Sequence, residues 1–197
     1  MQRILAAALF VFGVGTAKGA TISWAKWKQD TLGLSGTASG IIELQSGRVR
    51  IHYKGEVQPP SRMGFGRPEW VPHSTFIGGV VSNQPRRGDQ VSFYGGAGKG
   101  TNVITFSRPV TNPIIAVYSL GDGGVRATLN FNKVSLSFES GGPTKRHRGG
   151  AITIENGNIV VGQEGNGTVQ VNGTVSRISF TAPVYEKFCS ITVGLPE

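Results

Sequence analysis

The sequence predicts an all-β protein, folded as a single-domain antiparallel β-sandwich of jelly-roll-like type. Short runs rich in β-branched and aromatic residues recur along the chain, and glycine, asparagine and proline separate them. No stretch maintains a helical period. With 30 glycines and 10 prolines among 197 residues, the chain has the turn formers that a meander of hairpins requires. A domain of this length can bury a real core.

Residues 1–20 predict a cleaved signal peptide. One cation, Arg3, precedes an unbroken apolar run, and small residues follow it. That run is too short to cross a bilayer, which takes about 20 apolar residues. We expect cleavage between Ala17 and Ala20, export from the cytoplasm, and a sandwich formed by residues 21–197. No second apolar segment is long enough to span a membrane.

The predicted strands are short and many of them alternate between apolar and polar residues. Within 48–53, Val, Ile and Tyr alternate with two Arg and one His, which is typical of a sheet with one face in solvent. In chain order, the expected strands are Thr21–Lys28, Thr37–Leu44, Arg48–Tyr53, Gln90–Tyr94, Asn102–Ser107, Ile114–Ser119, Arg126–Asn130, Val134–Phe138, Ala151–Glu155, Ile159–Gly162, Thr168–Val171, Val175–Thr181 and Ser190–Gly194.

The connections predict hairpins. Asn156-Gly157 and Asn172-Gly173 are residue pairs that tolerate positive φ at both central positions of a tight turn. Residues 95–101 are rich in glycine and predict another hairpin, since the spacing around Lys99 does not match a phosphate-binding loop. The least regular segment, Gln58 to Val81, is expected to be a long surface excursion.

The charge balance favours anionic partners. The full chain carries a net charge of +9, and only two cations, Arg3 and Lys18, belong to the predicted leader, so about +7 remains. Such a charge promotes contact with acidic polysaccharide, lipopolysaccharide, phospholipid headgroups or nucleic acid. The single cysteine, Cys189, cannot form an internal disulfide and is expected to be a buried thiol.

Two groups of residues are candidate ligand-binding residues. The first is basic and could form an anion-binding face, although a solvated loop without a ligand explains it equally well. The second lies in the irregular segment and could contact sugar rings, or could instead close the mouth of the sandwich as a small core. The candidates are Arg62, Arg67, Trp70, His73, Arg86, Arg87, Lys145, Arg146 and Arg148.

The sequence predicts no catalytic residues, no metal site and no cofactor. Glycoside hydrolysis needs two carboxyl groups that flank the bond, and no two of the 11 acids form a recognisable pair. The three histidines, His52, His73 and His147, are too dispersed to indicate zinc. No Gly-x-Ser-x-Gly nucleophile motif is present.

Six blocks of the chain form an ordered set: ATISW (20–24), SGTASG (35–40), YKGEV (53–57), NVITFSRPVTNPIIAVYSLG (102–121), EGNGTVQ (164–170) and SRISFTAP (176–183). Taken in this order, they resemble the ectodomains of secreted bacterial PEP-CTERM proteins. The resemblance implies export from a Gram-negative cell and a role at the surface or in the exopolysaccharide matrix, with no catalytic residues. The 197 residues do not include the Pro-Glu-Pro sorting signal of that group.

From these observations we expect a secreted, non-enzymatic protein of the cell surface or extracellular matrix. Its expected partner is an acidic polysaccharide or envelope glycan, held by a basic face, and it can self-associate as a homo-oligomer. Two alternatives stay open: a carbohydrate-active enzyme, and a protein that binds DNA or another matrix polyanion. A close carboxylate pair in a cleft would favour the enzyme, and convergence of the basic residues on one face would favour polyanion binding.

Overall fold

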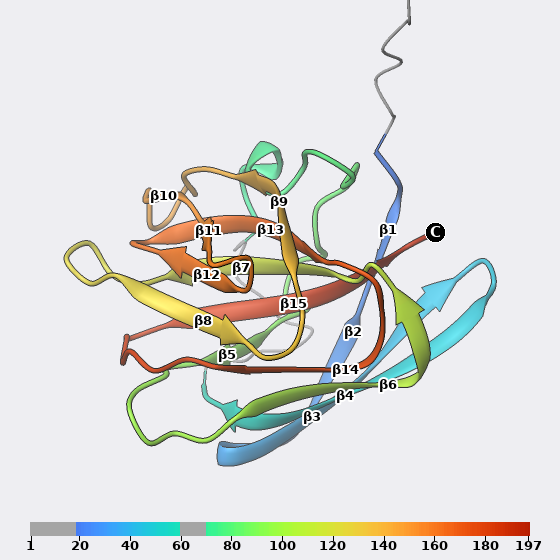
Figure 1. The fold of residues 1–197 in the computed structure, drawn as a ribbon, viewed down its shortest axis with the longest axis horizontal. Coiled ribbons are helices and arrows are strands. Elements are labelled where there is room, and N and C mark those ends of the chain that lie inside the picture. Colours follow the sequence, from blue (N-terminus) through green and yellow to red (C-terminus); the bar gives the residue numbers. More distant parts are fainter. Residues whose placement is uncertain (1–18, 60–69) are drawn as a thin grey trace, which may run out of the picture.

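The computed structural model describes residues 19–59 and 70–197, which form two large, mainly antiparallel sheets packed face to face (Figure 1). The predicted all-β sandwich is therefore confirmed. The predicted leader, residues 1–18, lies outside the described residues. Within the described part of the chain, no helix is both long and apolar enough to cross a membrane. The one short helical turn there is η1 (His73–Thr75).

The first sheet has seven strands in the order β1-β15-β7-β13-β10, with β5 also paired to β15 and β9 to β13. All its pairs are antiparallel except the short β10–β13 pair. Its strands are β1 (Ile22–Trp24), β5 (Val91–Phe93), β7 (Ile114–Leu120), β9 (Leu136–Gly141), β10 (Gly150–Ala151), β13 (Gly165–Val171) and β15 (Cys189–Pro196).

The second sheet has eight strands in the order β11-β12-β8-β14-β6-β4-β3-β2, all antiparallel. The β3–β4 hairpin is its longest pair and projects beyond the rest of the sheet (Figure 1). Its strands are β2 (Lys26–Thr31), β3 (Gly33–Leu44), β4 (Gly47–Val57), β6 (Asn102–Thr111), β8 (Ala127–Phe131), β11 (Thr153–Glu155), β12 (Ile159–Gly162) and β14 (Thr174–Thr181).

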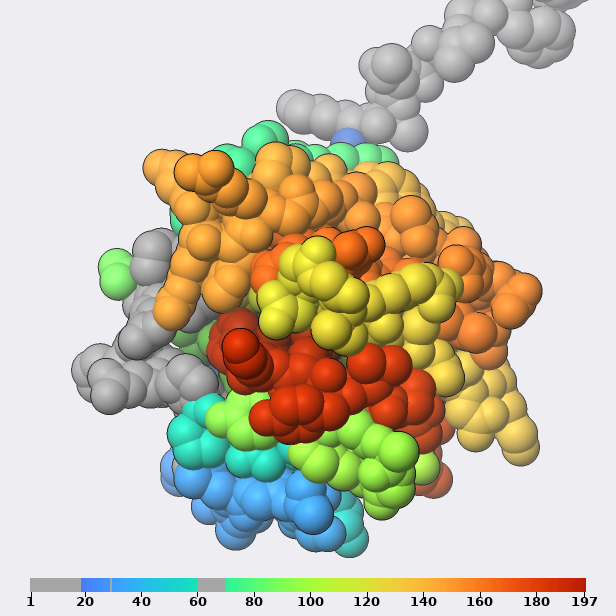
Figure 2. All heavy atoms as spheres, turned by 90° about the vertical axis from the view of Figure 1, so that its left-hand side faces the viewer, coloured from blue at the N-terminus to red at the C-terminus, as the bar shows by residue number. Residues whose placement is uncertain are grey.

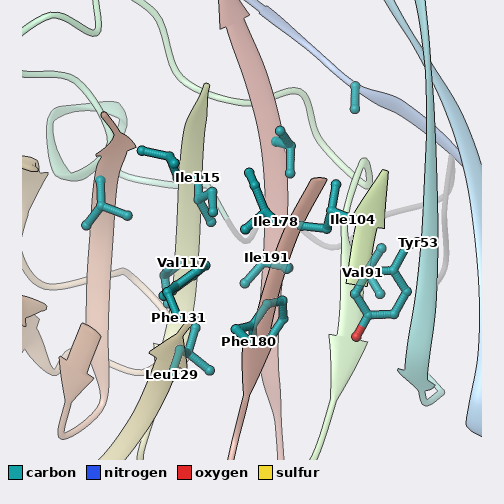
Figure 3. Packing of buried hydrophobic residues seen from close by; sticks show 14 of the residues in the cluster. Tyr53, Val91, Ile104, Ile115, Val117, Leu129, Phe131, Ile178, Phe180 and Ile191 are labelled. Carbon is teal, nitrogen blue, oxygen red and sulfur yellow. The ribbon is translucent and has the colours of Figure 1, made fainter. Parts of the chain in front are cut away.

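The main core lies between the two sheets (Figure 3). Inward-facing residues of alternate positions meet there, and aromatic rings fill its centre: Phe180 lies 5.3 Å from Phe131 and 5.8 Å from Phe93 between ring centroids. Cys189 is fully buried in this core, as expected for an inert thiol. The alternation read in 48–53 is confirmed, since Val49, Ile51 and Tyr53 are all buried.

The N-terminal strand differs from the prediction. The sequence predicts one strand over Thr21–Lys28, but the chain changes sheets at Ala25, whose N–H donates to the Val193 carbonyl at 2.8 Å. Trp24 therefore packs on the first sheet, and Trp27 packs in the main core. Both indoles are buried, and neither is available for surface stacking.

The seven-stranded sheet is covered on both faces. In β7, Ile115 and Val117 belong to the main core, whereas Ile114, Ala116 and Tyr118 belong to a second cluster on the opposite face. Residues 70–81 cover this second face with Trp70 and Phe76, which are also buried. The segment expected to be a surface excursion thus provides part of the core, and the small-core alternative is correct for its aromatic residues within the described range.

Polar contacts fasten this covering segment to β1. The Asn83 side chain pairs with the backbone of Ile22 in both directions, accepting at 2.6 Å and donating at 2.9 Å. The indole N–H of Trp24 donates to the Asn83 carbonyl at 3.2 Å. Asn83 therefore takes the place of a neighbouring strand residue, and the segment is held at a fixed position over the sheet.

The Asn156-Gly157 hairpin is confirmed between β11 and β12, whereas the hairpin predicted at Asn172-Gly173 is wrong, because it joins β13 of one sheet to β14 of the other. The glycine-rich residues 95–101 do not form the predicted hairpin either, because they join β5 of one sheet to β6 of the other. Lys99 is fixed within this crossover by the Glu56 carboxylate at 2.9 Å, which also accepts the Gly95 N–H at 2.9 Å. Burial would raise the pKa of Glu56, but the bonds from Lys99, Gln58 and Gly95 outweigh it and lower that pKa. Lys99 is thus a structural ion-pair partner and not a phosphate ligand.

We predict that Phe76→Ala lowers the free energy of unfolding by about 3 to 5 kcal/mol, because it empties a fully buried site in the second cluster. Urea unfolding followed by tryptophan fluorescence measures the change. Leu34→Ala is the matched control, since Leu34 is 59% exposed and its truncation should change stability by less than about 0.5 kcal/mol. Equal effects of the two substitutions would contradict a second core.

Candidate anion-binding site

A pocket of about 310 Å³ lies at the edge of the covering segment, beside the second cluster. Four of the residues predicted from the sequence line it: Trp70, His73, Arg86 and Arg87. Its remaining lining residues are Val71, Gln84 and Pro85, so no acidic side chain among the described residues lines it. The fold has therefore brought two separate sequence segments together to form one cationic concavity.

The two arginines reach the pocket through a tight turn. The Asp89 N–H donates to the Arg86 carbonyl at 3.3 Å, and Gly88 adopts a positive φ of 80° that favours glycine. Both arginine side chains are exposed. The turn therefore carries two successive exposed arginines, and a guanidinium group can bind carboxylate or phosphate oxygens through paired N–H donors.

Asp89 lies behind these arginines and is half-buried. Burial raises the pKa of its carboxyl group, while the Trp27 N–H, which donates to it at 3.3 Å, and the nearby Arg86 and Lys26 act in the opposite direction. Asp89 therefore stands close to a cation of the pocket turn and to a cation of β2.

Trp70 does not have the predicted geometry for stacking on a sugar. Its ring is 2% exposed and lies edge-on to Phe76 at 5.1 Å and to Tyr118 at 6.0 Å. Its indole Nε1 is buried and has no hydrogen-bond partner among the described residues.

The basic run at 145–148 lies next to the pocket. Thr144 and Arg148 close a small two-way bridge, and the Lys145 N–H donates to the Val71 carbonyl at 3.1 Å. Lys145, Arg146 and Arg148 are exposed on this loop. The predicted basic residues that the structure describes thus come from three segments that meet at one end of the molecule. Arg62 and Arg67 lie outside the described residues.

His147, between these cations, faces inward. Its ring stacks on Phe188 at 6.2 Å and lies edge-on to Tyr118 at 5.6 Å, and its Nδ1 is 3.6 Å from Glu164 Oε2. Burial lowers the pKa of His147, and Arg146 lowers it further. This histidine links the aromatic cluster to a group of carboxyl groups that no sequence motif indicates.

Three acids, Asp122, Glu164 and Glu186, come together beside His147. The loop at 121–126 and the segment at 182–188 lie against each other at this end of the sandwich, yellow and red in Figure 2. The Glu186 carboxyl accepts the Gly121 N–H at 2.6 Å, and Glu164 accepts a long bond from Ser119 at 3.4 Å. The three acids are far apart in sequence, so no spacing could reveal the cluster.

Burial is the main reason why the pKa of Glu186 rises from 4.5 to about 8, and the neighbouring Glu164 and Asp122 raise it further. Burial also raises the pKa of Glu164, again with help from Asp122. Both carboxyl groups therefore hold protons more tightly than isolated ones. Among residues 19–59 and 70–197, no three metal-ligating side chains are arranged to hold an ion.

Comparison with known protein families, with curated proteins and with solved structures gives no match to this chain.

We predict that stability falls as the pH rises from about 5 to 8, because folded Glu186 retains a proton that the unfolded chain releases near pH 4.5. The stability that protonated Glu186 contributes is fully present below pH 4.5 and is lost as the pH rises through the folded pKa of about 8. Glu186→Gln stays neutral and keeps an acceptor for Gly121, so the variant should be more stable than the parent at pH 8, by a few kcal/mol.

Thermal unfolding of both proteins across this pH range measures the difference. Glu43→Gln, at an exposed position, is the control and should leave the pH profile of the parent unchanged. If the melting temperatures of the parent and of Glu186→Gln changed with pH in the same way, the pKa of Glu186 would not be raised in the folded protein.

Proposed function

We propose that the protein is a non-enzymatic component of the cell surface or extracellular matrix that binds acidic polysaccharide through the pocket formed by Trp70, His73, Arg86 and Arg87. The observation that carries this proposal is their convergence on one cationic concavity next to the basic loop at 145–148. The net charge of about +7 that remains without the predicted leader acts in the same direction by attracting polyanions over longer range.

The chemistry of the pocket suits a carboxylated sugar. Arg86 and Arg87 line the pocket, and a guanidinium group can bind carboxylate oxygens through paired N–H donors. Apolar surface from Val71 and Pro85 accommodates the less polar face of a sugar ring. A nucleic acid would instead call for exposed aromatic rings on which bases stack, and the indole of Trp70 is buried.

An extracellular location forms part of the proposal. It is supported by the signal-peptide pattern of residues 1–20 and by the resemblance to secreted PEP-CTERM ectodomains. Ala20 adds a detail: its N–H donates to Val80 at 2.8 Å, and its carbonyl accepts the Ser82 N–H at 3.1 Å. Cleavage before Ala20 would keep both bonds in the exported chain.

The carboxyl cluster favours one competing function, a carbohydrate-active enzyme. Glu164 and Glu186 both have raised pKa values, as a general acid requires. The buried position of Glu186 and its bond to Gly121 also give it a structural role. Incubation with polygalacturonate and a reducing-end assay separates these functions: new reducing ends that disappear in Glu164→Gln would replace the binding proposal with hydrolysis.

We predict that Arg86→Gln weakens binding of the residue 19–197 protein to a short oligogalacturonide by about tenfold, because a charge-assisted hydrogen bond contributes roughly 1.5 to 3 kcal/mol. Isothermal titration calorimetry at 50 and 300 mM salt measures the affinity, which should fall as salt rises. Lys187→Gln, which removes the same charge from an exposed position outside the pocket, should bind like the parent.

The neutral counterpart of the ligand gives the second control. An uncharged oligosaccharide of the same length should bind far more weakly than the oligogalacturonide. Equal binding of the two, or no effect of Arg86→Gln on a variant that melts at the parental temperature, would rule out the pocket as the anion site.

A further inference from the structure

A second concavity, larger than the pocket, runs across the outer face of the eight-stranded sheet. It has a volume of about 540 Å³ and is formed by β2, β3, β4 and β6. None of its lining residues was a candidate in the sequence analysis. They are Lys26, Lys28, Ser39, Gly40, Ile41, Arg50, Ile51, His52, Thr105, Phe106 and Ser107.

Strand register places the cations of this groove in two rows. Lys26 and Arg50 both pair with Ile41 of β3, from opposite sides, and Lys28 and His52 both pair with Ser39. Neighbouring strands lie about 4.8 Å apart, so the rows on β2 and β4 are separated by about 10 Å, with β3 as the floor between them.

The groove is cationic and contains no acidic lining residue. Of the acids on these strands, Glu43 pairs with Arg48 at 3.1 Å, and Asp30 accepts a hydrogen bond from Ser39 at 3.1 Å and keeps one negative charge at the edge of the groove, against the three positive charges of Lys26, Lys28 and Arg50. Lys26, Lys28 and Arg50 are exposed, so an anionic ligand can reach them. Charge complementarity therefore selects a polyanion as the occupant.

The floor distinguishes among polyanions. Ile41 gives it an apolar surface between the charged rows, while Ser39, Thr105 and Ser107 supply hydroxyl groups. Phe106 and Trp27 are 4% and 6% exposed, so neither ring is available for a base to stack on. Alternating hydroxyl, apolar and cationic groups without a stacking platform match a carboxylated glycan chain better than a nucleic acid.

The turn that carries Arg86 meets the edge strand of the groove. The Asp89 side chain, three residues after Arg86, accepts the N–H of Trp27, which lies in β2 between Lys26 and Lys28. The pocket turn therefore adjoins the row of groove lysines on β2. A chain long enough to pass β2 can contact both.

We infer that the groove is a second subsite, in which a long carboxylated polysaccharide continues from the pocket across β2 to β4. The inference rests on the proposed function, because it takes the pocket as the first subsite. The protein would then bind long acidic chains more tightly than short ones, because short oligosaccharides occupy the pocket alone and long ones occupy the groove as well. Two linked contacts strengthen binding without any change in either one.

The test compares oligogalacturonides of two and about ten residues with the parent and with the double variant Lys28→Ser, Arg50→Ser. The parent should bind the long ligand at least tenfold more tightly than the short one. The groove variant should lose this gain and keep the parental affinity for the short ligand. Lys133→Asn with Lys187→Ser removes the same charge outside the groove and should retain the gain; asparagine suits the positive φ of 57° at Lys133.

The outcomes separate the two proposals. If the groove variant keeps the full length gain, the groove subsite is overturned while the pocket stands. If Arg86→Gln leaves short-ligand binding intact but the groove variant loses long-ligand binding, the pocket is overturned and the groove binds independently. Tighter binding of a single-stranded DNA 20-mer than of the long glycan, at equal salt, would overturn the assignment of the ligand.

Discussion

The arrangement of this protein depends on burying both faces of β7. One face is covered by the opposing sheet, as in any sandwich, but the other requires a second covering, which the segment around Trp70 and Phe76 provides. An uncovered outer face would expose a broad apolar surface. Because this covering must hold a fixed position, the turn carrying Arg86 and the loop carrying Lys145 are also fixed, and the pocket follows from the demands of the core.

Much of the fold could be predicted because its rules are local. Alternation identified β4, and the Asn156-Gly157 pair identified the hairpin turn between β11 and β12. The Asn172-Gly173 pair marks a turn, but the hairpin predicted there is wrong because β13 and β14 belong to different sheets. Two further features depend on distant partners and were missed. The chain leaves one sheet for the other at Ala25, and residues 95–101 cross between sheets; neither event changes the local composition. The unbroken apolar run of β7 is the one local signal of two-sided burial.

The candidate site, like the fold, could be predicted from the sequence only in part. Residue type alone marked Arg86, Arg87 and Lys145 as possible anion ligands, and the structure places them at one end. Residue type could not show that the Trp70 ring is buried, because tryptophan occurs in both loops and cores. The carboxyl cluster and the groove could not be predicted, since the first is assembled from loops far apart in the chain and the second from strands whose register the sequence does not reveal. Alternate residues of β2 and β4 form the two sides of one groove only because β3 lies between these strands.

Asp89 also affects whether copies of the protein can associate through the edges of their sheets. Strand β2 is the free edge of the eight-stranded sheet, and an unpaired edge invites another chain to add a strand. Asp89 occupies the outward N–H of Trp27, and the lysines beside it would meet the same lysines of an approaching copy. The lysines that form one row of the proposed groove therefore also oppose the addition of a second copy at this edge, and under the proposed function an anionic chain lying along β2 would weaken that repulsion.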